Sequence, residues 1–277
     1  MLVHARYLSY GLLALFAGVS LAVSQEHATH RTRAEMEEFL LNANVVSRKT
    51  LGQGTTDSER ATLSDGKLEH DAHIQSVDVS TNEFKTLHGS ELNFKDSFKY
   101  NIAAYRLDKI LDLNMIPVSV PRKVGGKSSA VTWWVDDKMM DEVDRKKQGL
   151  EPPDKDAWNK QMYVVRVFDQ LIYNTDRNLG NLVIDKQWRM WMIDHTRAFR
   201  TDPKLRSEAN LVMCDRKFLA NMRKLDEDTL KEQLLPYLTK TEIKSMLTRR
   251  DKIVRFFDDA VASKGEGAVL YDLPPRE

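Results

Sequence analysis

The chain has 277 residues, of which 42% are hydrophobic, so it is long enough to bury the core of one large domain or of two packed lobes. Its 42 Lys and Arg residues nearly balance its 41 Asp and Glu residues, and the formal charge of +1 excludes the overall basic field that non-specific nucleic-acid binding uses. The single cysteine, Cys214, excludes an internal disulfide and cysteine-based zinc or iron–sulfur sites.

The first 24 residues differ in composition from the rest of the chain. A short start with His4 and Arg6 is followed by an apolar run over 8–23, which ends in the small-x-small pattern Ala22-Val23-Ser24. This pattern predicts a secretory signal peptide over 1–24 and export of the remainder to the periplasm or the extracellular space. The alternative is an uncleaved signal anchor, in which case the protein contacts a membrane only through this N-terminal segment.

Residues 25–137 alternate between helical and strand periodicity. In chain order they predict a helix over 33–44, strands over 45–51, 59–63 and 67–77, a helix over 96–111, and strands over 118–124 and 129–135. A glycine loop at 52–54, an Asp65-Gly66 turn and the pair Gly125-Gly126 separate the strands. We therefore expect an antiparallel β-rich lobe with one helix packed on it.

The remainder of the chain is mainly helical. The polar stretch 138–155, which contains Pro152-Pro153, predicts an inserted loop between the lobes. After it come an amphipathic helix from Asp156 to about Tyr173, short strands over 182–184 and 190–193, and helices up to Ser263. Residues 156–263 thus predict a helical C-terminal lobe, and 264–277 a flexible tail.

The densest group of polar residues surrounds the predicted short strands. Asp176 and Asn181 precede the first strand and Asp194 follows the second, so we expect their side chains to converge although they are distant in sequence. Carboxylate and carboxamide oxygens suit Mg²⁺, which takes its other ligands from water and substrate phosphates. An Asx-rich surface turn is the competing interpretation, because turns favour the same residues.

The same region resembles a known family. The segment VFDQLIYNTDRN over 167–178, together with Ile193-Asp194-His195 and Phe199, resembles the catalytic region of phosphatidylinositol 3/4-kinase-like proteins, a branch of the protein-kinase-like superfamily. The pattern there is D-R-x-x-x-N followed by I-D-H. Asp176 and Asn181 are five positions apart, and Asn181 and Asp194 thirteen, as in a kinase catalytic loop and metal-binding strand end. The resemblance implies an α+β, two-lobed protein-kinase-like fold.

The resemblance also implies roles for these residues. Asp176 would be the catalytic base that accepts the proton of the acceptor hydroxyl, and Arg177 would orient the loop or face a phosphate. Asn181 and Asp194 would hold Mg²⁺. The cofactors would then be ATP, or another nucleoside triphosphate, and magnesium.

Two upstream segments fit the same fold. Gly52, Gly54 and Thr55 would form the phosphate loop, whose exposed backbone N–H groups can approach nucleotide oxygens. Residues 133–137, with Asp136, would form the hinge that faces adenine.

Two positions depart from the family pattern. Gln75 occupies the place of the lysine that contacts the α- and β-phosphates, and Asn101 occupies the place of the glutamate that pairs with it. The joint loss is physically coherent, since a Gln–Asn pair can hydrogen-bond without leaving a buried charge uncompensated. A cation from elsewhere could compensate, and the candidates are Lys67, Lys85, Lys95, Lys99 and Arg106.

We therefore expect a kinase-like phosphotransferase that moves a nucleotide phosphoryl group to a hydroxyl acceptor on a lipid, a protein or a small molecule. The alternative is an exported pseudokinase or scaffold that keeps the fold without turnover. A metal trio of His70, Asp71 and His73 is disfavoured, because strand residues three apart face opposite sides.

Overall fold

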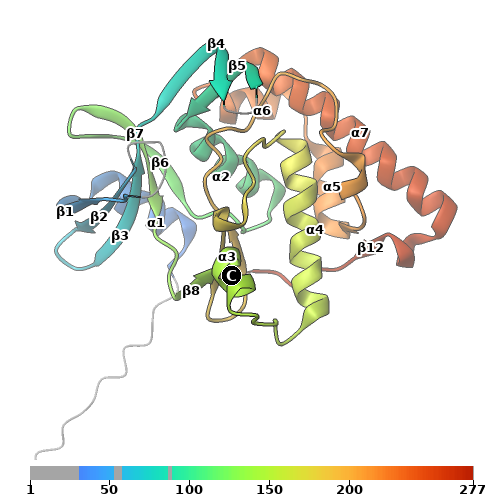
Figure 1. The fold of residues 1–277 in the computed structure, drawn as a ribbon, viewed down its shortest axis with the longest axis horizontal. Coiled ribbons are helices and arrows are strands. Elements are labelled where there is room, and N and C mark those ends of the chain that lie inside the picture. The colour runs from blue at the N-terminus through green and yellow to red at the C-terminus, as the bar shows by residue number, and fades with distance from the viewer. Residues whose placement is uncertain (1–30, 53–57, 87–88, 277) are drawn as a thin grey trace, which may run out of the picture. The chain divides into compact units, whose positions relative to one another are not determined.

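The β-rich lobe is built on an antiparallel sheet with the strand order β1-β2-β3-β7-β6. The computed structural model describes residues 31–52, 58–86 and 89–276 (Figure 1). The strands of this sheet are β1 (Asn44–Thr50), β2 (Ser58–Ser64), β3 (Glu69–Gln75), β6 (Ser119–Val124) and β7 (Lys127–Trp133). Ala61, Leu63, Ala72 and Ile74 alternate along β2 and β3 and are buried, so one face of the sheet joins the core and the other bears polar residues.

Two helices pack against this sheet. The helix α1 (Arg33–Asn42) begins with a capping box, in which Thr32 and Glu35 satisfy each other's backbone N–H groups. The helix α2 (Lys99–Leu111) is buried along most of its length and ends at Asp112, which adopts a left-handed conformation with φ of 55°. Both helices contact β6 and β7.

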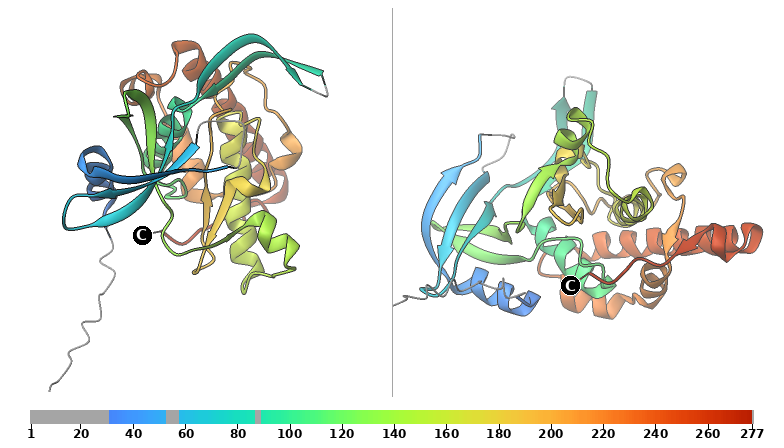
Figure 2. Two further views of the ribbon diagram at one scale, coloured as in Figure 1. Left: turned by 60° about the vertical axis from the view of Figure 1, so that its left-hand side comes forward. Right: turned by 90° about the horizontal axis from the view of Figure 1, so that it is seen from below.

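A long hairpin, β4 (Asp78–Thr86) and β5 (Gly89–Ser97), lies between β3 and α2 in the sequence. Figure 2 shows it projecting away from the main sheet. Its base is held where Ser97 N donates to Thr196 O at 2.9 Å, and where Arg200 Nη1 donates to Asn93 O at 2.8 Å. The hairpin therefore connects the β-rich lobe to the segment that follows Asp194.

The second lobe is centred on the long helix α4 (Lys155–Leu171), with α7 (Lys240–Lys264) packed against it (Figure 1). A small sheet of order β10-β9-β8 carries the polar loops. The remaining elements are β8 (Lys138–Asp141), α3 (Glu142–Lys147), β9 (Leu182–Asp185), β10 (Met190–Met192), β11 (Cys214–Asp215), α5 (Arg216–Lys224), α6 (Glu227–Leu234), β12 (Leu270–Tyr271) and short 3-10 turns at 179–181, 208–210 and 266–268. This arrangement confirms the predicted α+β fold with a sheet lobe and a helical lobe.

Three segments differ from the expectations. The predicted helix over 96–111 starts at Lys99, because residues up to Ser97 belong to β5. The stretch 138–155, expected as a loop, holds β8 and α3, which are anchored by the buried side chains of Met140 and Glu142. The tail also has structure, since β12 pairs in parallel with β11 and the Tyr271 hydroxyl donates to Lys160 O at 2.6 Å. The domain boundaries remain predictions.

The signal-peptide segment lies outside the described residues, as do Gly54 and Thr55. Within 31–52, 58–86 and 89–276, none of the helices is both long enough and apolar enough to cross a bilayer.

Candidate active site

The loop that follows α4 is held in shape by its own amide side chains. Asn174 is buried, its Nδ2 donates to Asp169 Oδ1 at 3.0 Å, and its Oδ1 accepts from Asp176 N at the same distance. This Asx turn reverses the chain after α4 and places Asp176 at the surface of the loop, with 41% of its side chain exposed. A carboxylate in such a position can reach a substrate.

Arg177 holds the loop together from inside. Its guanidinium binds both carboxylate oxygens of Asp169, at 2.9 and 3.1 Å, and donates to the carbonyls of Asn181 and Ile193, each at 2.9 Å. Its Nη2 also lies 2.9 Å from His195 Nε2. Burial, with the nearby charge of Arg177, keeps the pKa of His195 well below its ordinary value, so the ring is neutral and accepts this bond. These contacts make Arg177 an orienting group.

Backbone and side-chain bonds bring the two metal-ligand candidates to the same place. Asn181 Nδ2 donates to Asp176 O at 3.1 Å, and Ile193 N donates to Asn181 O at 3.0 Å. Asp194, the next residue, turns the chain with φ of 52°, and its Oδ1 accepts from Thr196 Oγ1 at 3.0 Å. These bonds join the segments that carry Asp176, Asn181 and Asp194, and the convergence of the three side chains on one ion stays a prediction.

The positions that depart from the family pattern are in contact. Asn101 Nδ2 donates to Gln75 Oε1 at 2.7 Å, and Asn101 Oδ1 accepts from His195 N at 2.7 Å. Both side chains are buried. The neutral pair therefore links β3, α2 and the residue after Asp194.

The histidines of β3 lie on opposite faces of the strand. The ring of His70 stacks on Trp133, with centroids 3.6 Å apart, and its Nε2 lies 2.7 Å from Asp136 Oδ1. His73 faces the other way, hydrogen-bonds to Ser58, and has a pKa lowered by burial against the opposing charge of Asp194. Among the described residues, no group of three or more His, Cys, Asp or Glu side chains could by itself hold a metal ion.

The hinge candidate is tied down by side-chain contacts. Asp136 Oδ2 accepts from Trp133 Nε1 at 2.9 Å, in addition to the His70 contact, so its carboxylate braces the chain between β7 and β8. Gly52 lies just beyond β1, with nothing within 4 Å of where its Cβ would stand. The remainder of the predicted phosphate loop, Gly54 and Thr55, lies in the undescribed stretch 53–57.

Sequence reasoning missed two charged residues of the site. Asp96, on β5, is only 8% exposed, and its Oδ1 has no hydrogen-bond partner among the described residues. Burial raises the pKa of Asp96, and the charges of Asp194 and Asp176 raise it further, whereas Thr196 and Arg197 oppose the rise. Arg197 places Nη1 3.8 Å from Asp176 Oδ1. Asp96 was missed because the hairpin that carries it was not recognised, and Arg197 because no local pattern indicates that its backbone bonds to Thr175 and places it beside Asp176.

Comparisons with known proteins were made for both sequence and structure. No protein-family profile matches the sequence, and no curated protein matches it. Solved structures do match. A hydra Fam20 determined with sugar has a TM-score of 0.64 at 13% identity, covering 86% of this chain and 92% of its own. The Golgi casein kinase has a TM-score of 0.61 at 13% identity, and its form with Mn/ADP bound 0.62 at 14%, each covering 88% of this chain and 80% of its own.

The chain has a protein-kinase-like fold. At this level of identity the likeness establishes the architecture. It does not single out the phosphatidylinositol 3/4-kinase-like branch. Substrate, donor and acceptor must be argued from this chain's own residues.

Proposed function

We propose that this protein is a kinase-like phosphotransferase that uses a nucleoside triphosphate and a divalent cation to phosphorylate a hydroxyl acceptor. The proposal is carried by two hydrogen bonds that connect the segments bearing Asp176, Asn181 and Asp194. Asn181 Nδ2 donates to Asp176 O, and Ile193 N, beside Asp194, donates to Asn181 O. Phosphoryl transfer depends on positioning and charge stabilisation, so the arrangement of these groups matters more than any covalent step.

The polar groups present fit a divalent cation. Asp194 and Asn181 supply hard oxygen ligands, and the buried Oδ1 of Asp96 is an oxygen without a protein partner next to them. Asp194 and Asn181 would hold the ion, with Asp96 as an additional carboxylate, and the ion would offset phosphate charge. The Golgi casein kinase neighbour is a structure with Mn/ADP bound, which supports the choice of a nucleotide and a divalent metal, of which magnesium is our candidate.

Within this proposal Asp176 accepts the proton of the acceptor hydroxyl, and Arg177 keeps the loop in place through Asp169 and two backbone carbonyls. Gln75 and Asn101 position the residue after Asp194 without adding charge. The hinge at Asp136 and the loop containing Gly52, Gly54 and Thr55 remain our candidates for the adenine and phosphate contacts.

A second function is favoured by one observation. The Gln75–Asn101 bond replaces an ion pair by a neutral one, which removes a cation from the phosphate-binding region and suits a pseudokinase or scaffold. Export, predicted from residues 1–24, would place the protein where ATP is scarce. The acceptor hydroxyl could belong to a lipid, a protein or a small molecule.

Membership of the phosphatidylinositol 3/4-kinase-like branch is supported only by the sequence motif over 167–178 together with Ile193-Asp194-His195.

The two functions are separated by binding and turnover measured on residues 25–277. We expect Mg-ATP or Mn-ATP to raise the melting temperature, because a ligand of the folded state stabilises it, and we expect measurable nucleotide turnover. Asp194→Ala should abolish both, whereas Asp258→Ala, which removes an exposed carboxylate on α7 paired with Arg223, should change neither. Stabilisation without turnover would favour the pseudokinase, and turnover that survives Asp194→Ala would overturn the proposed active site.

A further inference from the structure

The phosphate-binding region needs a cation that β3 does not supply. Gln75 fills the usual position of the lysine and is bound to Asn101. A triphosphate carries more negative charge than one divalent ion offsets, so a kinase-like site without a basic side chain stabilises the developing charge poorly. The question is which base in this chain stands near Asp176 and Asp194.

Most of the basic residues considered from sequence are engaged elsewhere. Lys95 pairs with Glu242 at 2.7 Å and Lys99 with Asp78 at 2.8 Å. Arg106 stacks over Tyr237, and Arg177 is bound to Asp169 and to backbone carbonyls. Lys67 lies at the exposed β2–β3 turn, and the side chain of Lys85 is among those not described.

Arg197 is anchored beside the catalytic loop. Its carbonyl accepts from Thr175 N at 3.3 Å and from Thr175 Oγ1 at 2.9 Å, so its backbone is fixed to the residue before Asp176. Its guanidinium carbon lies 5.1 Å from the centre of the Phe94 ring on β5. The hairpin and the catalytic loop together therefore set the place of this side chain.

The surroundings of the guanidinium are acidic. Nη1 is 3.8 Å from Asp176 Oδ1, and the positive charge of Arg197 opposes the rise that burial causes in the pKa of Asp96. The charges of Asp176 and Asp194 also act on Asp96. A divalent ion would offset part of this negative charge. The planar, permanently charged guanidinium, 27% exposed, would then be able to meet phosphate oxygens with two parallel donors.

We propose that Arg197 is the base that contacts the transferred phosphoryl group, in place of the lysine that is absent from β3. The inference rests on the proposed function. In the step it assists, the acceptor oxygen forms a bond to the γ-phosphorus and the bond from that phosphorus to the β–γ bridging oxygen breaks. The hydroxyl proton goes to Asp176 and the nucleoside diphosphate leaves. Arg197 stabilises the negative charge on the transferred group and so acts mainly on kcat.

The test compares Arg197→Gln with Arg200→Gln in residues 25–277. Arg200 also lies over Phe94, at 5.7 Å, and donates to Asn93 O, so its variant removes a neighbouring charge and a similar ring contact. We expect Arg197→Gln to lower kcat/KM for Mg-ATP by about 100-fold or more, mostly in kcat, and Arg200→Gln to change it by less than about 3-fold. Arg197→Lys should retain an intermediate rate because it keeps the charge and loses the fork.

A second variant moves the positive charge back to β3 and so separates loss of charge from a folding defect in Arg197→Gln. Adding Gln75→Lys with Asn101→Glu to Arg197→Gln should recover at least about 10-fold of the lost kcat, since a cation returns to the phosphates with its partner. If Arg197→Gln and Arg197→Lys keep wild-type kcat while binding Mg-ATP, the assignment is wrong and the proposed function stands. If the wild-type protein neither binds nor turns over Mg-ATP, the proposed function fails and the assignment with it.

Discussion

At the scale of single residues, the candidate site contains both a neutral buried pair and a buried acid. Gln75 and Asn101 form a neutral buried contact, whereas Asp96 is buried with one oxygen lacking a partner. The Gln75–Asn101 hydrogen bond stabilises the folded chain, whereas the buried, partly unsatisfied Asp96 carboxylate destabilises it. A buried acid with one oxygen lacking a partner, and with its pKa raised further by the charges of Asp194 and Asp176, is a candidate for a functional group.

Asp96→Asn should stabilise the ion-free protein at neutral pH. A raised pKa in the folded state means that ionised Asp96 disfavours folding at pH values above the ordinary value of 3.8, and that this penalty is absent well below it. Because the amide does not leave a charged oxygen buried without a partner, we expect a gain of about 1 kcal/mol at pH 7, or about 2–4 °C in melting temperature. The difference from wild type should disappear near pH 3. A thermal scan series over pH tests this, and a destabilised variant at pH 7 would contradict it.

The same substitution should weaken the response to metal. If Asp96 adds a carboxylate to the ion site, the increase in melting temperature on addition of Mg-ATP should be smaller in Asp96→Asn than in wild type, although the variant begins more stable. An exposed control on α7, Asp258→Asn, should leave the increase unchanged. An equal response in all three proteins would exclude Asp96 from ion binding.

Gln75 and Asn101 should respond to charge as a pair. Gln75→Lys alone buries a cation without a partner and should cost about 2–4 kcal/mol, while Gln75→Lys with Asn101→Glu should cost less than the sum of the single changes. Urea unfolding of the four proteins of the cycle gives the coupling free energy. Additive effects would show that the two side chains are not energetically coupled.

At the scale of elements, the start of α7 links the helical lobe to the hairpin and to α2. Glu242 closes the capping box of α7 with Thr239 and also accepts from Lys95 and Tyr100, at 2.7 and 2.6 Å. Burial alone would raise the pKa of Glu242, but these donors outweigh it and hold the pKa below the ordinary value. A carboxylate that serves three elements at once should control how the lobes pack.

Glu242→Gln should therefore destabilise the protein by about 1–3 kcal/mol at pH 7. Because the folded pKa is lowered, the contribution of the carboxylate is present above pH 4.5 and is lost as pH falls through the folded pKa, so the difference from wild type should shrink below about pH 4. Glu227→Gln on α6, an exposed residue paired with Lys231, should change stability much less than Glu242→Gln does. Urea unfolding at pH 7 and at about pH 3 checks both.

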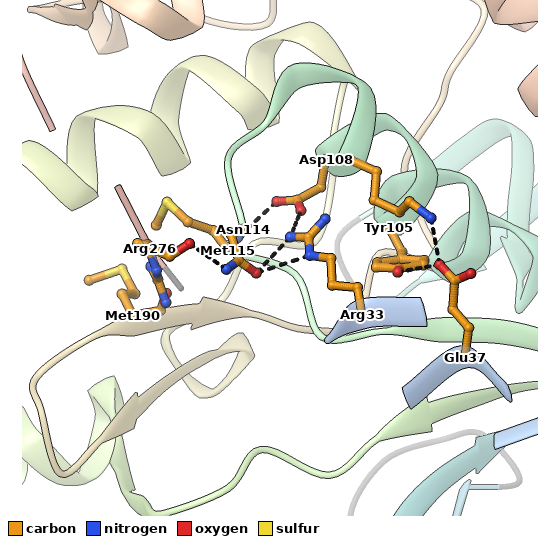
Figure 3. A network of polar contacts seen from close by, with 9 residues as sticks. Arg33, Glu37, Tyr105, Asp108, Asn114, Met115, Met190 and Arg276 are labelled. Atoms are coloured by element: carbon orange, nitrogen blue, oxygen red, sulfur yellow. Dashed lines mark hydrogen bonds and ion pairs between the residues drawn. The ribbon is translucent and has the colours of Figure 1, made fainter. Parts of the chain in front are cut away.

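At the scale of the whole molecule, a polar junction joins α1, α2 and the C-terminal tail (Figure 3). Arg33 donates to Asp108 Oδ2 at 2.5 Å and to Asn114 Oδ1 at 2.7 Å. Asn114 Nδ2 in turn donates to Arg276 O at 2.8 Å, and Arg276 Nη1 donates to Met190 O at 2.7 Å. Segments from both ends of the described chain thus meet at the loop after α2.

Removing Arg33 should destabilise this junction. Asp108 is fully buried, and burial raises its pKa against the opposing charge of Arg33, so Arg33→Met would leave an uncompensated acid. With Arg33 24% exposed, we expect a loss of about 2–3 kcal/mol in urea unfolding. Arg33→Met with Asp108→Asn should recover part of it, and Lys109→Met, which breaks the more exposed pair with Glu37, should have less effect. A larger loss of stability for Lys109→Met than for Arg33→Met would contradict the proposed importance of the buried Arg33–Asp108 pair.

Much of the fold followed from local patterns. Alternation along β2 and β3, the Asp65-Gly66 turn and the Gly125-Gly126 turn, with φ values of 84°, 57° and 83° for the three glycines, located the main sheet. The grouping of Asp176, Arg177 and Asn181 in one loop could be predicted because they lie within one short segment; their catalytic role stays a prediction. The hairpin β4–β5 was not, since its exposed apolar residues Val79 and Phe84 are an odd number apart and give no period-2 face.

By itself, the sequence determined which groups are available: the spacing of Asp176, Asn181 and Asp194, and the neutral pair in place of Lys and Glu. Only the tertiary structure decided that Asn101 bonds to Gln75 and to the backbone beside Asp194, and that Asp96 and Arg197 join the site. The spacing of residues along the chain determines which side chains one segment can bring together. The charges that meet in a site depend on contacts between segments about a hundred residues apart, such as β5 and the chain after Asp194, and no local pattern encodes these.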